Sequence, residues 1–190
     1  MGFQRGRAGL AVSEEGLWLA HGDEVSLLDP ISGKLRADVR VGGAWVNEID
    51  VGRTAFVANN ARGSGDADLG PRVQSFAPQT LEIGRTVPVA ADISDILVAS
   101  GYLWIALEFA HVLWQVDEAS LALRRTIDID DDLIALAFLD DAVWVVSQDE
   151  PVVRRVNPGS GRVEGMIEVG HTPEGAAAAN DLLWIAVREP

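Results

Sequence analysis

Leu103-Trp104-Ile105-Ala106 is one of five short stretches that share a pattern, an aromatic residue between apolar ones. The others are Leu17-Trp18-Leu19-Ala20, Ala55-Phe56-Val57-Ala58, Val143-Trp144-Val145-Val146 and Leu183-Trp184-Ile185-Ala186. Their aromatic residues follow one another at steps of 38, 48, 40 and 40 positions. A period close to 40 residues indicates that one small structural unit is repeated along the chain.

Two further markers repeat in step with the aromatic one. A turn sequence opens at Asp29-Pro30, Ala77-Pro78, Asp117-Glu118 and Asn157-Pro158, and a β-branched stretch closes each unit around Val39, Val87, Ile127 and Ile167. Both markers advance by 48, 40 and 40 positions. Asp and Asn at the start of a turn accept backbone hydrogen bonds, and proline fixes the turn's dihedral angles. Three markers with one period therefore support the same repeat.

Each unit is long enough for four strands, and the fourth unit shows them best. Residues 133–138 and 142–146 are nearly continuous apolar runs, as in strands buried on both faces. Residues 152–156 and 163–169 alternate, which predicts outer strands with one face in water. Four strands in each unit predict an all-β fold, a β-propeller built from four-stranded blades.

The segment from Val153 through Asn157-Pro158-Gly159-Ser160-Gly161 to Leu183-Trp184 resembles the YVTN-type repeats of lactonase-like propellers. Streptogramin-lyase-like proteins are near relatives of that group. The resemblance covers almost the whole chain and implies the fold. It does not imply one function, because propellers of this kind serve as enzymes, binding modules and scaffolds.

The repeat predicts blades at about 9–41, 42–89, 90–129 and 130–169, with half a blade at 170–190. We therefore expect about four and a half blades, a partial or open ring, in a chain that is part of a larger bacterial protein. The open blade ends are expected to allow self-association, since an unpaired strand edge is a template for another chain. The alternative is a complete small propeller that closes irregularly.

Composition excludes several classes of partner. The formal charge of −14 argues against nucleic acid, whose binding depends on Lys and Arg at phosphates. No apolar run approaches the roughly 20 residues of a membrane helix, so membrane insertion is not expected. Residues 1–10 do not form a signal peptide, and the absence of cysteine leaves the compartment open.

The candidate ligand-binding face is formed by loops that enter each blade and loops that join its second and third strands. In a propeller these loops share one face, and here they carry all three histidines and many carboxylates. The predicted residues are His21, His111, Asp131, Asp132, His171 and Glu174. No cofactor is expected, but such a rim is suited to a cationic ligand or to Ca²⁺ or Mg²⁺. The alternative is that these are ordinary polar loops.

Two other features have structural interpretations. The repeated tryptophans occupy one strand position, which predicts packing between neighbouring blades rather than a cofactor site. The second unit is longer because of an insertion at residues 60–70, which contains Asp66 and Asp68 and is predicted to be an exposed loop.

The function that these observations favour is a non-enzymatic module or scaffold that binds a protein or small-molecule ligand on the acidic face. The alternative is a metal-assisted lyase or lactonase acting at the channel mouth. The resemblance to streptogramin lyases points to His171 as the base of such an enzyme. No nucleophile elbow, HExxH, phosphate-binding loop or dinucleotide fingerprint is present in the sequence.

Overall fold

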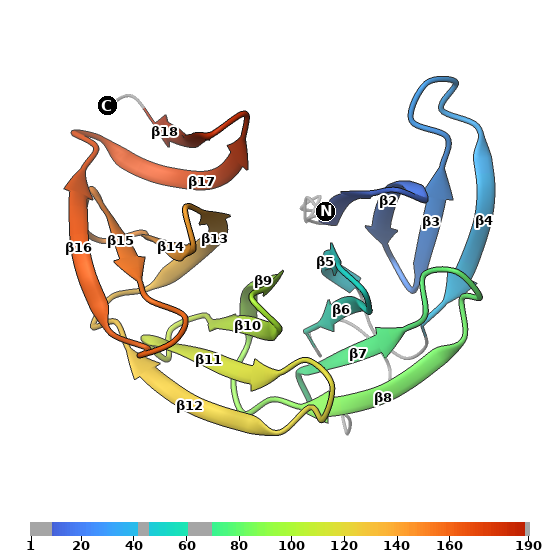
Figure 1. The fold of residues 1–190 in the computed structure, drawn as a ribbon, viewed down its shortest axis with the longest axis horizontal. Coiled ribbons are helices and arrows are strands. Elements are labelled where there is room, and N and C mark those ends of the chain that lie inside the picture. Colours follow the sequence, from blue (N-terminus) through green and yellow to red (C-terminus); the bar gives the residue numbers. More distant parts are fainter. Residues whose placement is uncertain (1–8, 42–45, 61–69, 189–190) are drawn as a thin grey trace, which may run out of the picture. The chain divides into compact units, whose positions relative to one another are not determined.

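The computed structural model describes residues 9–41, 46–60 and 70–188, and all regular structure in these ranges is β-strand (Figure 1). Residues 61–69 of the loop predicted at 60–70, with Asp66 and Asp68, lie outside the described residues. The chain divides into two compact units, Met1–Ile93 and Ser94–Pro190, and each is described by itself.

The first unit contains two four-stranded antiparallel sheets, in each of which consecutive strands are neighbours. The first sheet has β1 (Gly9–Ser13), β2 (Gly16–His21), β3 (Glu24–Leu28) and β4 (Leu35–Arg40). The second has β5 (Val46–Val51), β6 (Ala55–Asn59), β7 (Arg72–Phe76) and β8 (Ile83–Pro88).

The second unit contains two more such sheets and a two-stranded hairpin. The third sheet has β9 (Ile93–Ala99), whose first residue is the boundary between the units, β10 (Tyr102–Leu107), β11 (Val112–Asp117) and β12 (Leu123–Asp128). The fourth has β13 (Leu133–Leu139), β14 (Ala142–Ser147), β15 (Val152–Val156) and β16 (Val163–Glu168). The hairpin pairs β17 (Thr172–Ala179) with β18 (Leu182–Arg188).

Four-stranded antiparallel meanders are the blades of a β-propeller, so the predicted fold class is confirmed. In the fourth sheet the observed strands match the predicted ones to within one residue at each end. The repeat could place them because each strand is bounded by a turn whose chemistry recurs.

Packing between adjacent sheets of a unit explains the repeated tryptophans. Trp18 lies in an apolar cluster that joins the first and second sheets, and its ring centroid is 5.6 Å from that of Phe76. Trp104 is fully buried in the cluster that joins the third and fourth sheets. Each indole N–H has an acceptor five residues earlier, for example the Ala99 carbonyl at 3.2 Å from Trp104 Nε1. These two tryptophans are packing residues, as predicted.

The turn between the third and fourth strands of a blade has the predicted chemistry. Asp29 Oδ1 accepts hydrogen bonds from the Ser32 backbone N–H at 2.7 Å and the Ser32 hydroxyl at 2.9 Å. Asp117 makes the same pair of bonds to Ser120, and Asn157 uses its amide oxygen in the fourth sheet. The turn sequence therefore fixes the geometry of the outer hairpins.

Two expectations were wrong in the last part of the chain. Trp184, predicted to pack between blades, is 57% exposed. All of β16 is exposed, although its alternation predicted one covered face. Both differences have one cause in the described part of the chain. No further sheet packs on the outward face of β17 and β18, and this hairpin has no outer strands to lie against β16.

Candidate functional site

Four segments of the second unit form one continuous surface, called here the loop surface: residues 108–111, 129–132, 148–151 and 169–171. Backbone hydrogen bonds hold them together. The Ile129 N–H donates to the His111 carbonyl at 2.9 Å, and the Gln148 N–H donates to the Asp132 carbonyl at 2.8 Å. The Val169 N–H donates to the Pro151 carbonyl, also at 2.8 Å. The loops are therefore positioned by the main chain, whatever side chains they carry.

One of these bonds recurs in every complete blade. The residue just after the fourth strand donates its N–H to the carbonyl of the residue just before the third strand. The first unit has this bond from Val41 to Asp23 at 3.0 Å and from Val89 to Pro71 at 2.9 Å. The bond is a consequence of the repeat, and it fixes where the chain leaves one blade for the next.

Asp131, at the entry to the fourth sheet, is the centre of a buried polar cluster. Its side chain is 1% exposed, and its Oδ2 lies 3.1 Å from Arg154 Nη1. Asp131 Oδ1 accepts a hydrogen bond from the Asp149 backbone N–H at 3.2 Å. Arg154, whose side chain is 12% exposed, also donates to Ser147 Oγ at 2.9 Å and to Glu150 at 2.6 Å. This cluster ties β14 and β15 to the connection that enters their sheet.

His111 and Asp132 come together on the loop surface. His111 Nε2 lies 3.5 Å from Asp132 Oδ1, and the histidine is exposed while the carboxyl is partly covered. Two residues before His111, the exposed Phe109 has a φ of 58°. This left-handed conformation is unusual for a bulky side chain. The turn therefore exposes an aromatic ring two positions before His111.

The remaining predicted residues have other surroundings. His171 is an exposed residue of the loop surface, and Glu174 of β17 pairs with Arg188 at 2.6 Å. His21 ends β2 in the first unit, where its Nε2 is 3.1 Å from Ser26 Oγ. The structure thus brings His111, Asp131 and Asp132 together on one connected set of loops.

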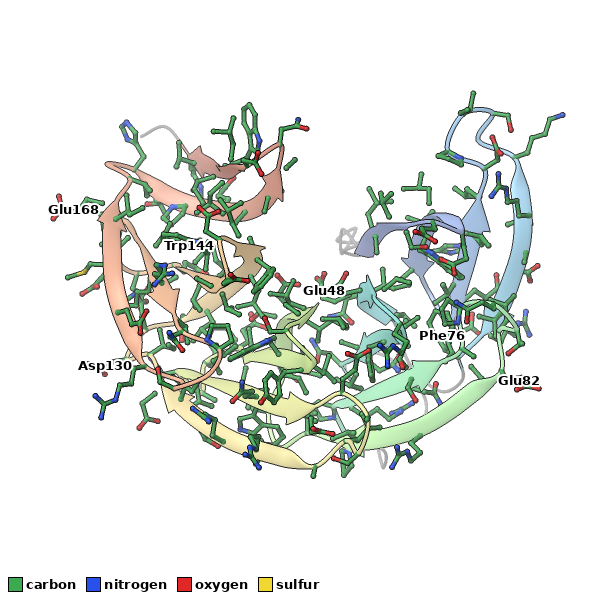
Figure 2. All side chains as sticks on the ribbon, viewed as in Figure 1. Glu48, Phe76, Glu82, Asp130, Trp144 and Glu168 are labelled. Atoms are coloured by element: carbon green, nitrogen blue, oxygen red, sulfur yellow. The ribbon has the colours of Figure 1, made fainter. Side chains whose placement is uncertain are left out.

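Carboxylates of the loop surface divide into paired and unpaired ones. Asp131 and Glu150 share Arg154. Within the described ranges, the others have no arginine or lysine ion-pair partner: Glu108, Asp130 (Figure 2), Asp132 and Asp149. These carboxylates give the loop surface a negative field.

Metal ligation has little support from side-chain placement. Residues 9–41, 46–60 and 70–188 contain no group of three His, Asp or Glu placed to hold a metal ion. They bring together pairs, such as His111 with Asp132. The same ranges contain no helix that could cross a membrane.

Sequence reasoning missed Arg154 and Phe109. Arg154 stands on β15 at the position that Trp114, Gln74 and Ser26 occupy in the other sheets. The available signal was a pair of arginines between valines in a predicted strand, since a buried charge needs a partner. Phe109 gave no signal, because exposure of an aromatic residue in a short turn depends on the backbone conformation.

Comparison with known proteins supports the fold and leaves the activity open. No family model matches the sequence, and no curated protein resembles it in sequence. In contrast, 1073 solved chains match its structure, so the fold is a common one. One is the crystal structure of Myxococcus xanthus glutaminyl cyclase, with a TM-score of 0.66 and 12% identity. The match covers 96% of this chain and 86% of that chain. At this identity the similarity concerns the fold alone.

Proposed function

We propose that this chain is a non-enzymatic binding module, related to YVTN-type and streptogramin-lyase-like propellers, that takes a cationic ligand on the loop surface. The ligand class is an amine or guanidinium group, either on a small molecule or on a Lys- or Arg-rich protein segment. The observation that carries the proposal is that carboxylates without an arginine or lysine partner, Glu108, Asp130 and Asp132, lie on the same connected loops as the exposed ring of Phe109.

Cation binding follows from the chemistry of these groups. Carboxylates attract a cation over several ångströms, and the face of an aromatic ring adds about 0.5–1 kcal/mol at an exposed site. Asp130 is exposed and Phe109 projects from the neighbouring turn. The backbone hydrogen bond between Ile129 and His111 holds the two segments together, so the groups need little reordering on binding.

The alternative is a metal-assisted lyase or lactonase, and the glutaminyl cyclase match adds cyclisation of an amino-terminal glutamine as an activity to test. No specific contact among the described residues favours either reaction over binding. The binding proposal is therefore the one that side-chain placement supports best.

Calorimetric titration with tetra-arginine, tetra-lysine and a neutral tetra-glycine peptide tests the proposal. We expect binding of the two cationic peptides that weakens with added salt, and at least a fivefold loss of affinity in Asp130→Asn or Phe109→Ala. Asp141→Asn, an exposed carboxylate in the turn between β13 and β14, is the matched control and should bind normally. Equal binding by all variants would contradict the proposed site.

The enzyme alternative is tested on the same protein. A glutaminyl peptide and a lactone are incubated with it, with and without added Ca²⁺, Mg²⁺ or Mn²⁺. Product formation that is lost in His171→Ala or Glu174→Gln would replace the binding proposal with the enzymatic one.

A further inference from the structure

We infer that protonation of His111 weakens the binding of a cationic ligand by the loop surface, so that the ligand is released as the pH falls from about 8 to about 5.5. The inference rests on the proposed function and names how that same site is regulated. It is carried by the contact between His111 and Asp132, by the burial of one carboxylate oxygen and by the position of Phe109 on the same turn as the histidine.

His111 and Asp132 face each other across two loops of the second unit. His111 Nε2 lies 3.5 Å from Asp132 Oδ1. Main-chain hydrogen bonds fix both loops, since the His111 carbonyl accepts one from the Ile129 N–H at 2.9 Å and the Asp132 carbonyl accepts one from the Gln148 N–H at 2.8 Å. Neither bond involves a side chain, so the backbone keeps the imidazole and the carboxylate opposite each other in both charge states of the histidine.

The Asp132 carboxylate has an oxygen that lacks a partner. Its Oδ1 is buried and has no hydrogen-bond partner among the described residues, which is unfavourable for a charged acceptor. A neutral histidine carries its proton on either ring nitrogen, whereas a charged one carries a proton on both. Protonation of His111 therefore places an N–H donor and a positive charge opposite this oxygen. At higher pH the negative charge of Asp132 is not neutralised in this way and helps to attract a cation.

The other charged groups around His111 are mostly carboxylates. Segments 108–111, 128–132 and 148–151 contain no lysine or arginine, and Arg154 beside them is engaged with Asp131 and Glu150. Apart from His111, the titratable groups on these segments are Glu108, Asp128, Asp130, Asp131, Asp132, Asp149 and Glu150. Ordinary carboxyl groups keep their charge above about pH 5. A histidine is therefore the kind of group that changes the charge of these segments between about pH 8 and about pH 5.5.

The positive charge on His111 also lies on the turn that carries the proposed cation-binding ring. Phe109 is two positions before His111 in this four-residue turn, and its side chain is exposed. Protonation thus neutralises an attractive carboxylate and adds a repulsive charge. One unit charge about 6 Å from another changes an equilibrium constant by roughly threefold in water, and by more beside a protein surface. We therefore expect the affinity for the cation to fall by about three- to tenfold.

Calorimetric titration with acetylated tetra-arginine amide at about pH 8 and about pH 5.5 tests the inference, because the charge of this peptide is constant in that range. The natural chain should lose about three- to tenfold in affinity at the lower pH. His111→Asn should lose less than about twofold, since asparagine gains no proton and tolerates the φ of 58° at this position. His171→Asn is the matched control: it removes the other histidine of the loop surface, which has no contact with Asp132 within the described ranges, and should keep the pH dependence.

The outcomes separate this inference from the proposed function. An unchanged pH dependence in His111→Asn, or its loss in His171→Asn, would overturn the inference and leave the binding proposal standing. Absence of binding at either pH would overturn both. Carbon-13 NMR of the free protein tests the pairing itself. The Asp132 carboxyl signal should move as the His111 ring gains its proton and should stay fixed in His111→Asn. An Asp132 signal that moves equally in both proteins would contradict the pairing.

Discussion

Replacing Asp131 with asparagine should destabilise the protein far more than replacing its neighbour Asp130. Asp131 is buried and faces Arg154, whereas Asp130 is exposed. Asp131→Asn leaves the positive charge of Arg154 with Ser147 and Glu150 as partners, and Glu150 lies mostly in solvent.

The magnitude follows from this geometry. Removing one partner of a fully buried ion pair costs about 3–5 kcal/mol, and the remaining partners of Arg154 reduce this to about 2–3 kcal/mol. For a chain of this length, about 2–4 °C of melting temperature correspond to each kcal/mol, so we expect a loss of roughly 4–12 °C. Asp130→Asn should change stability by less than about 0.5 kcal/mol.

Urea denaturation followed by tryptophan fluorescence measures both variants at low protein concentration. The difference between them should persist in high salt, because a buried pair is screened little. Arg154→Met should partly rescue Asp131→Asn, since it removes the unpaired charge. Equal stability of Asp131→Asn and Asp130→Asn would refute the idea that this cluster holds the loop surface in place.

Three further predictions concern the blades. Trp104→Ala should cost about 3–5 kcal/mol in urea denaturation, and Trp184→Ala less than half as much, because only Trp104 is fully buried. Gly33→Ala should cost about 1 kcal/mol, since its φ is 67° and its surroundings are open. Gly161→Ala should cost a similar amount in the same assay, because its φ is 70° and the flexible Arg125 side chain, 2.6 Å from an added Cβ, can move aside. Hydrogen bonds from Ser32, its backbone N–H foremost, hold the pKa of the Asp29 carboxyl well below its usual range. That stabilisation is present above the ordinary aspartate pKa and is lost as the pH falls through the lower folded-state pKa. In thermal melts at decreasing pH, the deficit of Asp29→Asn should therefore shrink only in strong acid.

The sequence was sufficient to predict the blades because the residues that determine their strands and turns act locally. Turn residues such as Asp117 and Asn157 act within a few positions of themselves, and the strand pattern follows from which faces are buried. The burial of a side chain also depends on which strands and sheets pack against it, and the repeat period of the sequence does not show that. Trp104 and Trp184 share one motif, but among the residues that the structure describes only Trp104 has a third strand and a following sheet beside it.

The candidate site was predictable in part for the same reason. The positions of the loops in the repeat predicted that His111, Asp131 and Asp132 lie near one another. The His111–Asp132 contact and the backbone hydrogen bond between their loops agree with that prediction. Which carboxylate is buried depends on Arg154, twenty-three positions further along the chain, and no spacing rule relates the two. His21 and His171 remain predictions, since neither has a contact that links it to His111.

The backbone hydrogen bond that closes each complete blade has a consequence for how such a protein can change. Its acceptor is the main chain of Asp23, Pro71, His111 or Pro151, so chemically unrelated residues perform the same structural task. Selection can therefore replace the side chains of these loops without disturbing the blades that carry them. After a duplication, each copy of the blade could keep its strands while its loop acquired a different chemistry. Replacing residues 108–111 with an unrelated four-residue turn is the experiment that reproduces such a change.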